Sequence, residues 1–147
     1  MTIFASAEAL EAFGARLAAV ARIGDVIALS GELGAGKTTL ARGLLRGLGL
    51  DGEVPSPTFT LIQTYEPPEL RLPVWHCDLY RLEDPEEAIE LGLDEAFDQA
   101  LVLIEWPERL GRYLPADALR LQLEGAGEAE RRLTAAVPAA WEGRWPL

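Results

Sequence analysis

Apolar and polar positions alternate along the chain with two periods, one typical of helices and the other of strands. A helical period after Ser6, a good N-cap residue, predicts a helix to about Arg22 with Leu10, Phe13, Leu17 and Val20 buried. Two uninterrupted apolar runs, at 25–30 and 101–105, are typical of parallel strands buried on both faces. Between them, leucines at helical spacing predict a second helix over 37–48, which Gly49 ends.

The second half of the chain predicts further strands and short helices. Residues 59–65 and 73–79 are expected to form one antiparallel hairpin, and residues 119–123 and 132–137 another, across a turn at 125–127. Asp84 opens a short helix that Gly92 ends, and a second short helix opens at Asp94. A short helix is also expected at 109–113 and an edge strand at 2–5. These elements indicate a three-layer α/β fold with a mixed central sheet, as one domain over 1–147 whose tail at 138–147 carries no prediction.

A glycine-rich segment between the first buried strand and the second helix carries the strongest chemical signal. It reads Gly31-Glu-Leu-Gly-Ala-Gly-Lys-Thr38, followed by Thr39, and fits the pattern G-x-x-x-x-G-K-[ST]. Glycines let the backbone amides close around a phosphate, and the next helix directs its positive dipole end to the same anion. The expected fold is therefore P-loop NTPase-like, with nucleotide contacts from Gly31, Glu32, Leu33, Gly34, Ala35, Gly36, Lys37, Thr38 and Thr39.

Two side chains of this segment have distinct chemical roles. We expect Lys37 to reach the β- and γ-phosphates as a point charge and the Thr38 hydroxyl to be a ligand for Mg²⁺. Lys37 is the only lysine among the thirteen Lys and Arg residues. A compact ammonium thus stands at the one position where a planar guanidinium would differ chemically.

Two carboxylates end the strands that are expected to lie beside this loop. Glu105 follows four apolar residues, as in a Walker B strand, and we expect it to complete the Mg²⁺ shell or to act in catalysis. Asp78 ends the second arm of the first hairpin and leaves three alternatives open. It contacts Mg²⁺ through water, orients the attacking water, or pairs with Arg81.

Other polar and aromatic residues give weaker signals. The segment 56–60 lies where P-loop GTPases carry the loop that senses the γ-phosphate, so Ser56 or Thr58 is a candidate contact to that phosphate or to the metal. His76, the lone histidine, is interpreted as a hydrogen-bonded strand residue and not as a metal ligand, because it has no partners at ligand spacing. Trp106 is either a core residue or part of a contact surface.

Composition narrows the class of protein and its partners. The 147 residues are 49% hydrophobic, contain one cysteine and carry a net charge of −11. These values exclude an internal disulfide and make direct, tight binding to nucleic acid unexpected. No apolar run is long enough to span a membrane, and the first residues lack the basic region of a signal peptide, so a cytoplasmic location is expected. Eight acidic and no basic residues occupy 83–98, which form either a solvated face or a docking surface.

The nucleotide base is predicted from a missing motif. The usual GTPases read guanine with an Asn-Lys-x-Asp segment, and this chain has no second lysine to form one. ATP is therefore favoured over GTP.

Four motifs in register resemble those of the TsaE family. They are the phosphate loop with Thr39, Ser56-Pro-Thr-Phe-Thr60, His76-Cys-Asp-Leu-Tyr-Arg-Leu82 and Leu103-Ile-Glu-Trp106. The resemblance extends from about Ser6 to the strand at Arg132 and leaves the tryptophan-containing tail outside. TsaE proteins are small bacterial P-loop ATPases required for N6-threonylcarbamoyladenosine in tRNA.

The resemblance implies binding of ATP and Mg²⁺, with weak hydrolysis that depends on docking to the TsaB–TsaD heterodimer. In that family TsaD transfers the modification to adenosine, ATP turnover drives or resets the complex, and tRNA is met only indirectly. By position, Glu105 matches the Walker B acid and Asp78 the required aspartate, so Lys37, Asp78 and Glu105 are the expected catalytic residues. Thr38, Glu105 and, through water, Asp78 are the expected Mg²⁺ ligands. Arg131 or Arg132 matches an arginine near the adenine.

Two other classes of function remain compatible with the motifs. One is a small-molecule P-loop kinase, although no compact arginine-rich lid is evident after Glu105. The other is a nucleotide-gated binding module with negligible catalysis. The fate of the γ-phosphate distinguishes all three classes.

Overall fold

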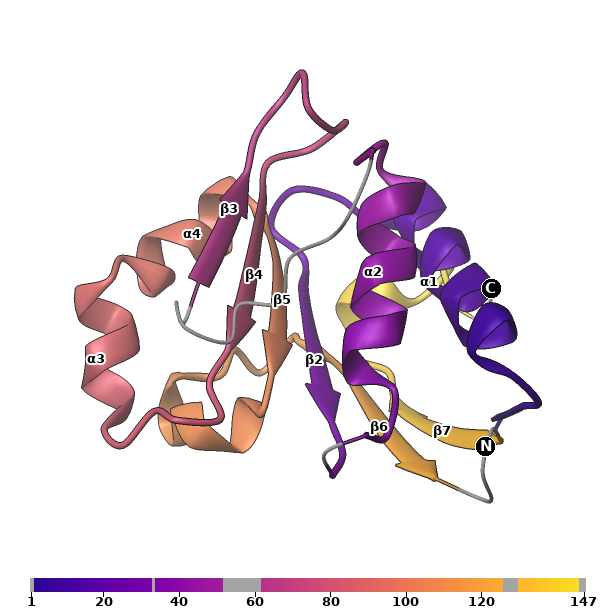
Figure 1. Cartoon of the computed structure of the whole chain (residues 1–147). Helices are drawn as coiled ribbons and strands as arrows, with labels where there is room; N and C mark the ends of the chain where they lie inside the picture. Colours follow the sequence, from indigo (N-terminus) through magenta and orange to yellow (C-terminus); the bar gives the residue numbers. More distant parts are fainter. Residues whose placement is uncertain (1, 33, 52–61, 126–129, 146–147) are drawn as a thin grey trace.

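A seven-stranded sheet in the order β1-β7-β6-β2-β5-β4-β3 runs through the molecule (Figure 1). The computed structural model describes residues 2–32, 34–51, 62–125 and 130–145. Within these ranges the strands are β1 (Thr2–Phe4), β2 (Val26–Ser30), β3 (Ile62–Tyr65), β4 (Val74–Asp78), β5 (Leu101–Glu105), β6 (Leu119–Gly125) and β7 (Arg131–Ala136). The central strands β6, β2, β5 and β4 are parallel, whereas β1, β7 and β3 pair antiparallel at the two edges. The prediction of a mixed central sheet is confirmed.

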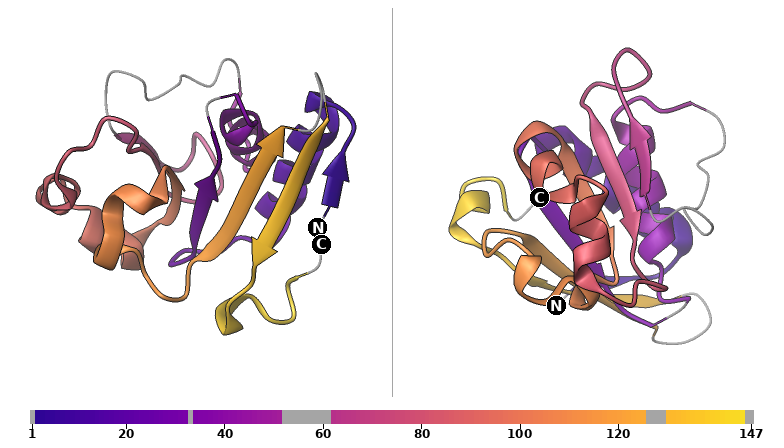
Figure 2. Two further views of the ribbon diagram at one scale, coloured as in Figure 1. Left: turned by 90° about the horizontal axis from the view of Figure 1, so that it is seen from below. Right: turned by 90° about the vertical axis from the view of Figure 1, so that its left-hand side faces the viewer.

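Helices cover both faces of this sheet, which confirms the three-layer α/β prediction. Helices α1 (Ala7–Val20) and α2 (Lys37–Gly47) lie on one face, and α3 (Pro85–Glu90) and α4 (Leu93–Gln99) lie on the other (Figures 1 and 2). A 3-10 helix, η1 (Pro107–Tyr113), follows β5 on the side of α3 and α4. No helix in the described part of the chain is long and apolar enough to cross a membrane.

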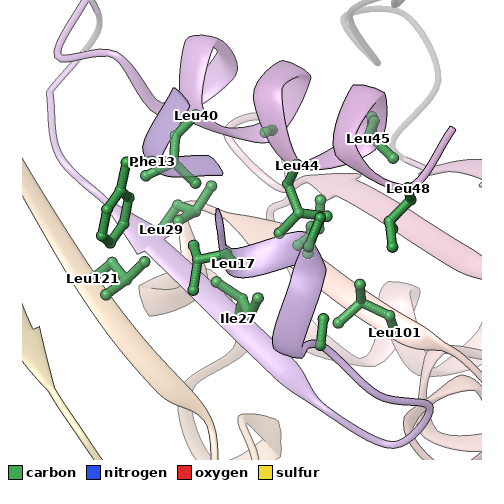
Figure 3. Close-up of a cluster of buried hydrophobic side chains, with 14 of the residues drawn as sticks. Phe13, Leu17, Ile27, Leu29, Leu40, Leu44, Leu45, Leu48, Leu101 and Leu121 are labelled. Atoms are coloured by element: carbon green, nitrogen blue, oxygen red, sulfur yellow. The ribbon is translucent and has the colours of Figure 1, made fainter. Parts of the chain in front are cut away.

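The larger core lies between the sheet and the α1–α2 pair (Figure 3). Leucines of α2 meet Ile27 and Leu29 of β2 and Leu101 of β5 there. The two helices approach closely because Gly43 has no side chain. A Cβ at that position would overlap the carbonyl oxygen of Glu11 in α1. This close contact fixes α2, and with it the loop that precedes the helix, against the sheet.

Local sequence signals set most element boundaries. The Ser6 hydroxyl accepts a hydrogen bond from the Ala9 amide at 3.1 Å and caps α1, as predicted. Asp84 caps α3 in the same way, and β5 has the predicted bounds. The short helix expected at 109–113 is a longer 3-10 helix interrupted at Gly111, whose φ of 52° is not helical. Residues 59–61 of the first hairpin and 126–127 of the second turn lie outside the described residues.

The tail from Pro138, which carried no prediction, packs onto the core. A 3-10 turn, η2 (Ala139–Trp141), buries the Trp141 side chain completely, and Trp145 meets the Phe13 ring edge-on at 5.8 Å between centroids. The Arg144 guanidinium forms a bidentate ion pair with Asp25, just before β2, at 2.6 and 3.0 Å. Aromatic burial and a long-range ion pair therefore hold the tail to the domain.

Candidate functional site

The phosphate loop connects the end of β2 to the start of α2, as the motif predicts. Gly36 has a φ of 106°, in the left-handed region where glycine is favoured, and a Cβ there would lie 2.6 Å from a methyl of Leu10. No side chain in the described part of the chain caps the first turn of α2, so the amide groups at its start are left for another acceptor. Free amides and the helix dipole together form an anion-binding geometry.

Lys37 is nearly buried at the first position of α2, with 5% of its surface exposed. Its ammonium donates hydrogen bonds to the carbonyl oxygens of Gly31 and, at 3.1 Å, of Glu32. Among the described residues no carboxylate lies within ion-pair distance of the ammonium. Burial lowers the pKa of Lys37, and the negative charges of Glu105, Asp78 and Glu108 partly oppose that shift. The lysine is thus a buried cation that only neutral groups contact.

Trp106 supplies one of those neutral groups. The Lys37 ammonium lies 4.1 Å from the centroid of the Trp106 ring, and the Tyr80 ring packs against the same tryptophan at 5.0 Å. Trp106 has a φ of 61°, which is unusual for a bulky residue, and its amide donates to the Leu29 carbonyl at 3.3 Å. The sequence left open whether Trp106 is core or surface; the structure places it, half-buried, beside the phosphate loop.

Glu105 is a buried carboxylate at the end of β5, with 3% of its surface exposed. The Thr38 hydroxyl donates to Oε1 at 3.2 Å, and His76 Nε2 lies 2.7 Å from Oε2. The predicted Walker B acid and the predicted threonine ligand are therefore adjacent, although they are 67 positions apart in the sequence. Strand pairing explains this, because β5 lies beside β2 and ends next to the loop.

Asp78 is the register partner of Glu105 on the neighbouring strand β4. Partial burial raises the pKa of Asp78 and the Glu105 charge adds to this, whereas the Tyr80 amide hydrogen bond, His76 and Lys37 act in the opposite direction. The Tyr80 amide donates to Oδ1 at 3.1 Å. Asp78 and Arg81 are both described and form no ion pair, so the structure does not support that alternative. Asp78 belongs to the same charged cluster as Lys37 and Glu105.

Arg131 lies near the loop, whereas Arg132 points to the other face of β7. Arg131 begins β7, and its Cγ and Cδ would be 3.8 and 3.9 Å from a Cβ placed on Gly36. Successive residues of a strand point to opposite faces, so Arg132 points away from the α1–α2 face and is exposed. Of the two arginines that the sequence offered, the geometry favours Arg131.

The other predicted contacts that the structure describes line or flank the loop. Glu32 and Gly34 are exposed, Ala35 is buried, and Thr39 lies half-buried in the first turn of α2. A cavity of about 530 Å³ lies beside the loop, between Gly31, Glu32 and Ala35 on one side and Trp106 and the end of β6 on the other. Leu33, Ser56 and Thr58 lie outside the described residues, so their predicted roles stay predictions.

His76 is the site residue whose role the sequence did not indicate. It is fully buried and hydrogen-bonded, as interpreted, but its partner is the Walker B acid itself. His76 and Asp78 are two positions apart on β4 and therefore point to the same face of the sheet. This spacing could have placed His76 on the face of the site, but only with the knowledge that β4 pairs with β5.

The fold and this site define the class: the chain is a P-loop nucleotide-binding protein. A family model described as threonylcarbamoyl adenosine biosynthesis protein TsaE matches residues 4–133. The chain belongs to the TsaE family.

Individual relatives agree with the family model. The chain is 44% identical to the tRNA threonylcarbamoyladenosine biosynthesis protein TsaE of Bacillus subtilis, over 86% of this chain and 78% of that protein. It is 40% identical to the protein of the same name from Rickettsia bellii, over 84% of this chain and 85% of that protein. A crystal structure of Bacillus subtilis YdiB superposes with a TM-score of 0.82 at 37% identity, over 97% of this chain and 88% of the other.

Proposed function

We propose that this protein binds ATP with Mg²⁺ at the phosphate loop and hydrolyses it in support of N6-threonylcarbamoyladenosine formation in tRNA. The observation that carries the proposal is the charged cluster at the carboxyl ends of β2, β5 and β4. Lys37 is a buried cation that forms no ion pair with a carboxylate of the described residues, and it lies next to the start of α2, which has no side-chain cap there. Both features favour an anion with several negative charges, such as a triphosphate.

The residues present fit Mg²⁺. Proteins hold this ion through one or two carboxylates together with substrate phosphates, and seldom through a complete protein cage. The Thr38 hydroxyl and the Glu105 carboxylate supply hard oxygen donors at one point, and the described residues contain no group of three or more acidic, His or Cys side chains that would hold a metal alone. When bound, Mg²⁺ would neutralise charge on the β- and γ-phosphate oxygens.

Other residues of this chain would bind the phosphates, limit the access of water and activate the attacking water. Lys37 and the loop amides hold the phosphates, and the half-buried Trp106 limits water on one side of Lys37. Asp78 has a raised pKa and lies beside Glu105, which suits a group that orients or deprotonates the attacking water. These roles for Lys37, Asp78 and Glu105, and for Arg131 near the adenine, are part of the proposal.

The proposed partner is the TsaB–TsaD heterodimer, with tRNA met only through it. All eight acidic side chains of 83–98 are exposed on and around α3 and α4, and the net charge of the chain is −11. Such a surface repels a phosphate backbone, so the protein partner would hold the RNA. A cytoplasmic location and a single ATPase domain belong to the same proposal.

Phosphate release with and without TsaB–TsaD tests this function. Wild-type turnover should be slow alone and faster with the heterodimer, and Glu105→Ala and Asp78→Ala should each lower the stimulated rate at least about a hundredfold. Glu66→Ala, an exposed carboxylate in the β3–β4 connection, serves as the matched control and should leave the rate unchanged. Phosphate appearing on a metabolite would indicate a kinase instead, and equal turnover in all four proteins would contradict the catalytic assignments.

The role in tRNA modification is tested in the cell of origin. A strain that lacks the gene should have little threonylcarbamoyladenosine in its tRNA by mass spectrometry. Wild-type protein should restore the modified base, and Lys37→Met should not. Normal modification in the deleted strain would contradict the proposed role.

A further inference from the structure

The Glu105 carboxylate has a different neighbour at each of its two oxygens. Oε1 accepts from the Thr38 hydroxyl at 3.2 Å, on the side of the phosphate loop. Oε2 lies 2.7 Å from His76 Nε2, inside the sheet layer. When the carboxylate is ionised both oxygens can only accept, so Nε2 is the donor in this pair. The plane of the carboxylate is therefore fixed from both sides.

We propose that His76 is a positioning residue for Mg²⁺ binding. It holds Glu105 Oε2 so that Oε1 faces Thr38 and the metal bound with the nucleotide. This assignment deepens the proposed function and rests on it, because it assumes that Mg²⁺ binds beside Thr38. His76 would touch neither metal nor nucleotide and would act only through Glu105.

Burial makes this hydrogen bond strong and exclusive. His76 has none of its surface exposed and Glu105 only 3%, so water does not compete for Oε2. His76 and Asp78 occupy alternate positions on β4, and Leu103 and Glu105 alternate positions on β5. The rigid register of the two strands therefore sets the distance between the imidazole and the carboxylate.

The surroundings of His76 argue against a purely structural role. Apart from Asp78 and Glu105, its neighbours on the same face of β4 and β5 are Val74 and Leu103, both fully buried and apolar. His76 Nδ1 is buried and has no hydrogen-bond partner among the described residues, which is unfavourable for a core side chain. The Nε2 bond to Glu105 is the interaction that a leucine at this position would not provide. Residues that orient metal ligands in this way typically affect metal affinity ten- to a hundredfold.

Replacements at position 76 separate the hydrogen bond from the packing. His76→Leu keeps a side chain of similar size but removes the donor. His76→Gln can place an amide N–H near the position of Nε2, whereas His76→Asn is one methylene shorter and does not reach Glu105. Val74→Ala makes a cavity on the same strand and face without touching the carboxylate, and is the packing control.

The readout is ADP affinity by isothermal titration calorimetry, once in EDTA and once in excess Mg²⁺. The ratio of the two dissociation constants measures how strongly Mg²⁺ and the nucleotide assist each other's binding, without any turnover. We expect His76→Leu to lose most of the wild-type ratio of dissociation constants, a decrease of about tenfold. Its ADP affinity in EDTA should stay near that of wild type. His76→Gln and Val74→Ala should keep the wild-type ratio, although Val74→Ala should lower the Tm.

The possible results distinguish the role of His76 from the proposed function. A wild-type ratio in His76→Leu would overturn the positioning role and leave the proposed function intact. Should that variant not fold, His76→Asn replaces it with the same expectation. A ratio of one in the wild-type protein would overturn the proposed Mg²⁺ site, and the assignment of His76 with it.

Discussion

The two ends of β2 carry charged clusters of opposite character. Before the strand, Asp25 and Arg144 form a bidentate ion pair, each with a side chain about one-tenth exposed. Arg144 also donates to the carbonyls of Val20 and Ala140 and lies 4.0 Å over the ring of Trp141. After the strand, Lys37 contacts carbonyls and an aromatic face, while Glu105 and Asp78 contact donors other than the lysine.

The first cluster is electrostatically complete and the second is not. A bidentate arginine–carboxylate pair satisfies both charges, so nothing is gained there by binding a ligand. At the other end the described residues include a buried cation and two nearby carboxylates that form no ion pair with it, which disfavours their burial. We propose that phosphate and metal supply the missing charges. Buried charge therefore indicates a functional site where the charged groups lack partners in the protein.

The largest expected effect is on the stability of the protein, through the Asp25–Arg144 ion pair that precedes β2. Arg144→Met leaves Asp25 buried without its partner and should cost about 3–5 kcal/mol of unfolding free energy. Urea denaturation measures this change. ATP affinity, measured by calorimetry in the folded protein, should stay unchanged.

The matched control for that variant is Arg112→Met. Arg112 is 79% exposed and 4.0 Å from Glu86, so its loss should leave the urea midpoint unchanged. Equal destabilisation by the two variants would contradict the claim that the buried Asp25–Arg144 pair contributes more to stability than the exposed Arg112 does.

Lys37→Met, in the cluster that follows β2, should have the opposite effects: a loss of ATP affinity without a loss of stability. ATP affinity should fall about a hundredfold, which corresponds to about 2.7 kcal/mol, because the phosphates lose their buried cation. Stability without ligand should stay equal or rise near neutral pH, since burial lowers the pKa of Lys37 and its charged form is disfavoured in the folded state. Lys37→Arg should not restore binding, because a planar guanidinium differs in shape from an ammonium. Strong destabilisation by Lys37→Met would contradict the account.

Arg131→Ala tests which arginine belongs to the site. We expect ATP affinity to fall about two- to fivefold, or about 0.5–1 kcal/mol, as for an arginine stacked on an exposed ring. Arg132→Ala, one residue further along β7, is the control and should leave affinity unchanged. Equal losses in both would indicate general electrostatic attraction in place of a specific contact.

The smallest effect is expected for the stability of Asp78→Asn. The pKa of Asp78 is raised above its ordinary value of 3.8, mainly by burial, so the folded state binds its proton more readily than the unfolded state does. Wild-type stability therefore falls as pH rises through the window above 3.8, because the folded state releases this proton less readily than the unfolded state does. Asp78→Asn should raise the Tm at pH 7 by about 1–2 °C, because solvent screens a half-buried group.

Scans at two pH values check the sign of this effect. The gain should vanish below pH 3.8, where the wild-type carboxyl is protonated in both states. A gain that grows on acidification would contradict the direction of the pKa shift.

The sequence predicted the cluster that follows β2 far better than the Asp25–Arg144 pair that precedes it. The phosphate loop is a contiguous motif, and an apolar run ending in Glu105 identifies its strand, so local signals sufficed for Lys37, Thr38 and Glu105. The hydrogen bond between His76 and Glu105 depends on the pairing of β4 with β5, which no local pattern states. Arg144 and Asp25 are 119 positions apart, and the tail that carries Arg144 has no periodic pattern. Its burial depends on tertiary packing of Trp141 and Trp145.

The stabilisation that ATP and Mg²⁺ give to each variant shows whether a ligand completes the charges at the carboxyl end of β2. The unfolding free energy of wild type, Arg144→Met and Lys37→Met would be measured by urea denaturation, with and without ATP and Mg²⁺ at a hundred times the wild-type dissociation constant. We expect a gain of about 2.7 kcal/mol for wild type and the same gain for Arg144→Met, despite its lower starting stability. Lys37→Met should gain almost nothing. A full gain in Lys37→Met, or its loss in Arg144→Met, would contradict the claim that the ligand completes the charges at the carboxyl end of β2.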